Sequence, residues 1–140
     1  MTEEELASFL EDQKVVTCAT IGPNGRPHLM PLWFVVDGDD LRGWTYAKSQ
    51  KTKNLERDPH ATLQIESGVE YQELRGVMME CDAEVVREGV EEFGTALFER
   101  YAPGIDVGDM IRQQAPKRVG LRFTPTRTVS WDHRKLGGTY

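Results

Sequence analysis

The sequence predicts a mainly β fold with short helices (α+β), arranged as a small antiparallel barrel of about six strands. Turn-forming residues at 22–25 and 37–40 separate apolar runs, a pattern typical of an antiparallel meander. Val119, Leu121 and Phe123 alternate with polar residues, which indicates a further strand. Residues 1–140 have the length of a single domain that can bury a core without disulfides or metals.

Each expected element has a local signal. The strands are predicted at 14–21, 27–36, 41–47, 61–66, 74–86 and 119–123, with the last resuming at 128–131. Short helices are predicted at 2–13, 49–58, 88–101 and 107–114. The first begins with Thr2 and Glu5 in the spacing of a capping box. The second ends before Pro59, because proline cannot continue a helix.

The charge of the chain is unevenly distributed. The formal net charge is -6, which argues against nucleic acid as the main partner. Two segments, 48–57 and 117–135, nevertheless hold ten of the 17 lysines and arginines and only two of the 23 acidic residues. Local basic segments in an acidic chain suggest one specific anionic ligand. Composition leaves open a second interpretation, in which these side chains are solvated near strand ends.

Several classes of protein are not expected. No apolar run approaches the roughly 18 residues of a membrane span, and the acidic N-terminus is unlike a signal peptide. We therefore expect a cytoplasmic protein without a membrane partner. Cys18 and Cys81 lie in apolar runs and are interpreted as buried thiols in a reducing compartment. The scattered histidines and these two cysteines lack metal-ligand spacing, so no metal is expected.

The stretch "AKSQKTKNLERDP" at 47–59 has the features of a phosphate site. Ser49 stands where a helix cap is needed, directly after a predicted strand. The first turn of a helix offers free backbone N–H groups and the positive end of the helix dipole. Lys51 and Lys53 add full charges, which favours phosphate binding. The alternative is an ordinary capped helix that carries surface lysines.

A longer pattern resembles a known family. Residues 19–59 contain "ATIGPNGRPH", then "W-F-x-x-D-G", then "S-x-K-x-x-N-L-x-x-D-P". This order is similar to the split β-barrel flavin and deazaflavin oxidoreductases, the pyridoxamine 5'-phosphate oxidase-like superfamily. The later segments "YQELRGV", "ERY", "KRVGLRF" and "SWDHRKLGG" resemble its actinobacterial branch that uses the deazaflavin coenzyme F420. Together the motifs cover nearly the whole chain.

The resemblance implies a split, FMN-binding-like barrel that forms a homodimer, with two cofactor sites between the barrels. Ser49 and Lys51 fall on the family's phosphate motif, Asn54 on a later position of that motif, and Thr45 at the end of the strand beside the ring. Other cofactor-binding positions implied by the resemblance lie on the strand that passes the ring and in a late segment placed near the site from the second subunit. They are Met30, Pro31, Leu32, Trp33, Trp131, His133, Arg134 and Lys135.

One departure from the family bears on the cofactor. FMN-using oxidases carry Arg and Lys on the strand before the phosphate motif, whereas this strand reads "HLMPLWFVV". The resemblance therefore implies F420 in preference to FMN, and it argues against pyridoxamine phosphate oxidation. The carboxylates of the F420 tail are expected to meet Lys53, Arg57 or the 117–135 segment.

The expected activity is hydride transfer between F420 and a small conjugated substrate. Two alternatives stay open: a non-catalytic carrier of a flavin, a deazaflavin or a tetrapyrrole-like ligand, and an FMN-dependent oxidase. Tyr71 and Arg75, in "EYQELRG", are candidates for a substrate pocket, or else a loop tyrosine and a solvated arginine. His133 is a candidate proton donor because of its pKa class, or else a surface histidine. The sequence does not identify the substrate.

Overall fold

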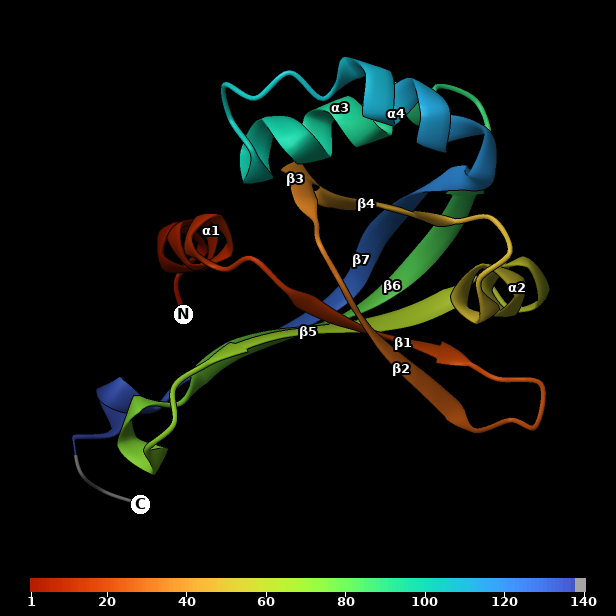
Figure 1. Cartoon of the computed structure of the whole chain (residues 1–140). Helices are drawn as coiled ribbons and strands as arrows, with labels where there is room; N and C mark the ends of the chain where they lie inside the picture. Colours follow the sequence, from red (N-terminus) through yellow and green to blue (C-terminus); the bar gives the residue numbers. More distant parts are fainter. Residues whose placement is uncertain (138–140) are drawn as a thin grey trace.

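The computed structural model describes residues 1–137 and confirms a mainly β protein with short helices (Figure 1). The strands are β1 (Val16–Ile21), β2 (Pro27–Leu32), β3 (Val35–Asp37), β4 (Asp40–Tyr46), β5 (His60–Ser67), β6 (Arg75–Val86) and β7 (Arg118–Asp132). The α-helices are α1 (Glu3–Asp12), α2 (Gln50–Arg57), α3 (Val90–Tyr101) and α4 (Gly108–Gln114). The 3-10 turns are η1 (Tyr71–Glu73), η2 (Ala115–Lys117) and η3 (His133–Leu136).

The described strands form one antiparallel sheet of seven, in the order β2-β1-β5-β6-β7-β4-β3, so the expectation of six strands was wrong. The predicted strand at 27–36 is two strands. β2 pairs with β1 at one edge of the sheet, and β3 pairs with β4 at the other. Trp33 and Phe34 leave the ladder between them. The apolar run "MPLWFVV" contains no turn residue, so its sequence carries no sign of this change of partner.

The sheet is rolled but not closed. Its two edge strands, β2 and β3, are joined by only two residues, Trp33 and Phe34. Since an extended residue spans at most about 3.5 Å, the two edges of a seven-stranded sheet come close together. No ladder joins β2 to β3 or β4 in the described chain, so the sheet does not close into a barrel. We call this gap between the two edges the split.

The longest strand, β7, runs without a break through Pro125. It pairs with β6 along nearly its whole length, and the register shifts so that Glu80 faces Arg127 while Cys81 faces Pro125. Thr126 is therefore the extra residue of a β-bulge. Bulges are places where proline is tolerated within a sheet. The interruption predicted between 123 and 128 is this bulge.

The core fills the inside of the rolled sheet. Phe9, Phe34, Leu63, Leu121 and Phe123 are all buried there. Cys18 and Cys81 lie among them as free thiols, which confirms the prediction of buried cysteines. Burial raises the pKa of Cys18 to about 11 and that of Cys81 to about 12.

A second apolar cluster lies outside the sheet, where α3 and α4 cover β4 and β7 (Figure 1). Trp44, Phe93, Leu97 and Ile111 form its buried part. The ring of Phe93 packs directly on the backbone of β7, because a Cβ at Gly120 would lie 2.7 Å from the ring carbons. This cluster fixes the two helices over the end of β4 that borders the split.

The predicted helix caps are confirmed. Thr2 and Glu5 form both hydrogen bonds of a capping box at α1. Ser49 caps α2, its side chain accepting from the backbone N–H of Thr52, and α2 ends before Pro59. None of the helices in residues 1–137 is long and apolar enough to cross a membrane.

Candidate functional site

Lys51 is a buried cation in the first turn of α2. Its side chain is directed inward, is only 6% exposed, and donates a hydrogen bond from Nζ to Oγ1 of Thr45 at 2.9 Å. Within residues 1–137 it forms no ion pair, and burial lowers its pKa. A buried ammonium without a carboxylate is unfavourable unless another anion completes its surroundings. The position of Lys51 therefore suits an anionic ligand.

A cavity of about 500 Å³ adjoins Lys51. It lies at the split, where β4 borders open space because β3 pairs with β4 only as far as Arg42. Its walls come from the end of β2 and the link that follows it, the end of β4, the start of α2, α3, α4 and the start of β7. The lining residues are Pro31, Leu32, Trp33, Trp44, Thr45, Tyr46, Lys51, Leu97, Phe98, Met110, Gln114 and Arg118. We call it the split cavity.

The split cavity brings together five of the residues predicted to bind a cofactor: Pro31, Leu32, Trp33, Thr45 and Lys51. Met30 is exposed on β2 and does not line it. Ser49 lines a neighbouring cavity of about 550 Å³, which shares Tyr46 with the first.

Asn54 has a structural place. It is fully buried, its Nδ2 donates to Oγ1 of Thr20 at 3.0 Å, and its Oδ1 accepts from Gln50 at 2.8 Å. These bonds join α2 to β1 and leave the Asn54 side chain outside both cavities.

The two basic segments are not equally available to a ligand. In 117–135, four cations have carboxylate partners, in the pairs Arg122–Glu84, Arg127–Glu80, Arg134–Asp132 and Lys135–Glu5. Lys117 and Arg118 have none within residues 1–137. Arg57 donates to the backbone carbonyl of Ile21 and to Asn54. The cations that border the cavities are Lys48, Lys51, Lys117 and Arg118.

These four cations lie together because two loops are joined. The backbone N–H of Ala47 donates to the carbonyl of Lys117 at 2.8 Å, and Tyr46 pairs with Arg118 across β4 and β7. The guanidinium carbon of Arg118 lies 3.7 Å from the ring centroid of Tyr46 and 4.7 Å from that of Trp44. Segments far apart in the sequence thus build one basic surface along the split.

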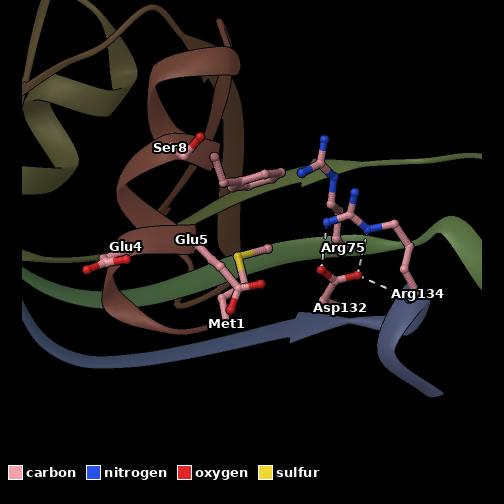
Figure 2. A pocket seen from close by; sticks show the side chains of 8 residues that line it. Met1, Glu4, Glu5, Ser8, Arg75, Asp132 and Arg134 are labelled. Carbon is pink, nitrogen blue, oxygen red and sulfur yellow. Dashed lines mark hydrogen bonds and ion pairs between the residues drawn. The ribbon is translucent and has the colours of Figure 1, made fainter. Parts of the chain in front are cut away.

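Arg75 and Arg134 line a different cavity, of about 290 Å³, between α1 and the ends of β6 and β7 (Figure 2). Asp132 holds Arg134 through two hydrogen bonds, Nε to Oδ1 at 2.9 Å and Nη2 to Oδ2 at 2.7 Å. These bonds lower the pKa of Asp132 to about 2. Arg75 pairs with Asp132 in the register of β6 and β7, and its guanidinium carbon lies 5.1 Å from the ring centroid of Phe9.

The other late residues lie at the same end of the sheet. His133 does not line the split cavity. Its Nδ1 lies 2.7 Å from the carbonyl oxygen of Tyr71, and the ring centroids of His133 and Tyr71 are 4.6 Å apart. Trp131 packs over Gly76. β6 has 12 residues, and at about 3.3 Å per residue its two ends are separated by roughly 35 Å. Within one chain this group is therefore remote from Lys51 (Figure 1).

The family profile described as pyridoxamine 5'-phosphate oxidase matches residues 2–132. The chain belongs to this family. Among solved structures, a conserved hypothetical protein of Mycobacterium tuberculosis, Rv2991, is 42% identical, with a TM-score of 0.91 over 100% of this chain and 90% of that one. A search of the curated proteins finds no match.

More distant solved structures of this fold carry different descriptions. An F420 reductase is 24% identical, with a TM-score of 0.72 over 87% of this chain and 94% of that one. HutZ of Vibrio cholerae, a heme storage protein, is 17% identical, with a TM-score of 0.72 over 93% of both chains. Likeness at this level shows the shared fold alone.

Three residues that line the split cavity each have a buried polar atom without a hydrogen-bond partner in the described chain, and the sequence did not predict them. Nε1 of Trp44, Oε1 of Gln114 and Nε of Arg118 are buried and have no hydrogen-bond partner within the described residues. Buried polar groups are normally paired. Together with Lys51, these donors and this acceptor fit a ligand that carries both an anionic group and a polar ring edge. Arg118 looks in sequence like every other arginine of the 117–135 segment, so no local signal distinguishes it.

Proposed function

We propose that this protein binds coenzyme F420 and is an F420-dependent oxidoreductase acting on a small conjugated substrate. The observation that carries the proposal is Lys51, a buried ammonium with no carboxylate partner in the described chain, in the wall of the split cavity. Lys51 would bind the phosphate, oriented by its hydrogen bond to Thr45. The bound deazaflavin supplies two-electron hydride chemistry, and the protein supplies binding and orientation.

The distribution of cations favours F420 over FMN. FMN ends at its phosphate, whereas F420 continues into several carboxylates. Lys48 and Lys117 line the cavity that adjoins the split cavity at Tyr46, and neither has a carboxylate partner within residues 1–137. The segment 27–36, whose counterpart carries Arg and Lys in the FMN-using oxidases, carries neither here. We propose that the F420 tail follows Lys48 and Lys117, not Lys53 and Arg57.

No side chain of the split cavity is an obvious general acid. Its wall contains no His, Asp or Glu among the described residues. We infer that a product proton comes from solvent or from His133 of a second copy. The second route is open only in a dimer, because His133 and Lys51 lie at opposite ends of β6 and β7.

A homodimer would also explain the outer face of the sheet. Leu29 on the edge strand is 60% exposed, and Val129 on β7 is exposed as well. Apolar surface of this kind favours association. We propose that two copies pair through this face and that the Trp131, His133 and Arg134 end of one copy approaches the split cavity of the other.

The dimer is tested by sedimentation at micromolar concentration. The unmodified protein is expected to sediment as a dimer, and Leu29→Glu is expected to shift it toward monomer. Ile105→Glu is the matched control, because Ile105 is 64% exposed in the loop between α3 and α4, outside the sheet. A stable folded monomer of the unmodified protein would contradict the proposal.

The cofactor is tested by fluorescence titrations with F420 and with FMN at low and high salt. F420 is expected to bind more tightly, with affinity falling as ionic strength rises, because the cations of the tail surface are partly exposed. Lys117→Ala is expected to weaken F420 and leave FMN unchanged. Tighter binding of FMN, or copurification with stoichiometric FMN, would overturn the F420 assignment.

Turnover separates an enzyme from a carrier. With reduced F420, the protein is expected to reduce a conjugated acceptor such as menadione, and to show no pyridoxamine phosphate oxidation. Tight F420 binding without turnover of any acceptor in a screen would favour the carrier interpretation.

A further inference from the structure

Trp33 is half-exposed and packs against two other aromatic rings. It is one of the two residues that link β2 to β3, and it lines the split cavity while remaining 45% exposed. Its indole stacks on the ring of Tyr101, with centroids 4.4 Å apart and planes at 11°. Phe98 meets it edge-on, with centroids 6.0 Å apart. A large aromatic side chain usually gains stability by burial. One face of the Trp33 indole is covered by Tyr101, and the part of the ring that stays exposed suggests a surface that binds a ligand.

Tyr101 is itself fixed by its hydroxyl group. This oxygen accepts from the backbone N–H of Phe34 at 2.9 Å and from Nη1 of Arg100 at 3.0 Å. Its own proton has two carbonyl acceptors in reach, Lys14 at 2.8 Å and Phe34 at 3.0 Å. The tyrosine beneath Trp33 is thus tied to the residue that follows Trp33 in the chain.

Arg100 ties the same unit to α1. Its Nη2 donates to the carbonyls of Leu10 at 2.8 Å and Gln13 at 2.7 Å, and its Nη1 donates to the carbonyl of Phe34 at 2.6 Å. One guanidinium, on the last turn of α3, therefore holds the C-terminal end of α1 and the link between the sheet edges at Phe34. Figure 1 shows α1 beneath this end of α3.

We infer that Trp33 is a preformed stacking platform for the tricyclic ring of the cofactor, and that Tyr101 and Arg100 are positioning residues that hold the platform. The inference rests on the proposed function, which puts the cofactor phosphate at Lys51. A cavity of about 500 Å³ has the size for one drug-sized ligand, so the ring meeting Trp33 belongs to that same ligand. Phe98, Leu97 and Met110 supply further apolar wall.

The test separates binding of the ring from binding of the phosphate. Riboflavin carries a flavin ring without phosphate, and inorganic phosphate carries no ring. Trp33→Leu is expected to weaken riboflavin binding about twofold to tenfold, the range of an aromatic contact, and Trp33→Phe is expected to restore most of it. Lys51→Met is expected to leave the affinity for riboflavin unchanged and to abolish the competition between inorganic phosphate and F420.

Tyr101→Phe tests the positioning role, because it keeps the stacked ring and removes only the hydroxyl. It is expected to weaken riboflavin binding about twofold to fivefold, with less quenching of riboflavin fluorescence, while the competition between inorganic phosphate and F420 is unchanged. A merely structural residue would lower both affinities together, and that result would overturn the positioning role. Trp33→Leu is at a half-exposed position, so it keeps the inference testable if a Tyr101 variant does not fold.

The outcomes distinguish this inference from the proposed function. If F420 binds the unmodified protein and Trp33→Leu binds F420 equally well, with or without detectable riboflavin binding, the platform is wrong and the cofactor assignment stands. If neither F420 nor FMN nor riboflavin binds, the proposed function fails and the platform with it.

Discussion

Replacing Arg100 with methionine is expected to lower the free energy of unfolding by about 3 kcal/mol or more, since each hydrogen bond from a charged group contributes about 1.5–3 kcal/mol. Its guanidinium donates to the backbone carbonyls of Leu10, Glu11, Gln13 and Phe34. Three of these carbonyls belong to the end of α1, where the last carbonyls have no partner within the helix. Urea denaturation measures the loss.

Arg87→Met is the matched control for that substitution. Arg87 is an exposed arginine that forms an ion pair with Glu56 at 2.8 Å, and exposed pairs are worth about 0–1 kcal/mol. Arg100→Lys keeps the charge but not the planar fork of donors, so it is expected to fall between the two. If the Arg100→Met and Arg87→Met variants are equally stable, the Arg100 side chain does not hold α1 against α3.

Replacing Lys51 with methionine is expected to weaken F420 binding by about 1.5–3 kcal/mol, or roughly 10-fold to 150-fold, without lowering the stability of the free protein. The two effects differ because the ammonium is buried and has no carboxylate partner in the described chain. Removing a buried, unpaired charge is often neutral or stabilising. Lys53→Met, on the exposed side of the same helix, is the control and should change neither quantity.

Titration gives Lys51 a second signature. Burial lowers its pKa in the folded protein below the usual 10.5. At pH values between the lowered pKa of Lys51 in the folded protein and its usual value in the unfolded chain, the unfolded chain binds more protons than the folded one. The stability of the free protein therefore rises with pH in this window. Phosphate binding needs the protonated amine and falls as pH rises through the same window. In Lys51→Met, this rise of stability with pH and this fall of F420 affinity with pH should both vanish. Denaturation at several pH values measures the first, and titration with F420 measures the second.

Local sequence signals predicted the elements well and their assembly poorly. The capping box at Thr2, the cap at Ser49 and the stop before Pro59 depend on neighbouring residues, and all three are confirmed. The division of 27–36 into β2 and β3 depends on which strands lie beside them, and no residue within the segment encodes that.

The candidate site shows the same contrast. The place of Lys51 beside a helix cap was predictable because a strand, a capping serine and a lysine follow one another within a few residues. Arg118 and Gln114 were not, because they reach the split cavity through the pairing of β4 with β7. Which arginines of the 117–135 segment remain without a carboxylate is decided by cross-strand partners such as Glu80 and Glu84, far away in sequence.

The place of β7 in the sheet has a consequence for the order of events during synthesis. It is the last strand of the described chain, yet it lies between β6 and β4, and Leu41 faces Phe123 across the ladder. A nascent chain that ends before residue 118 leaves the β3–β4 hairpin with an unpaired edge and no route into the sheet. Contacts this distant in sequence slow folding to roughly milliseconds to seconds. We expect native structure on the ribosome only after β7 has emerged, with the earlier strands exposed to chaperones until then.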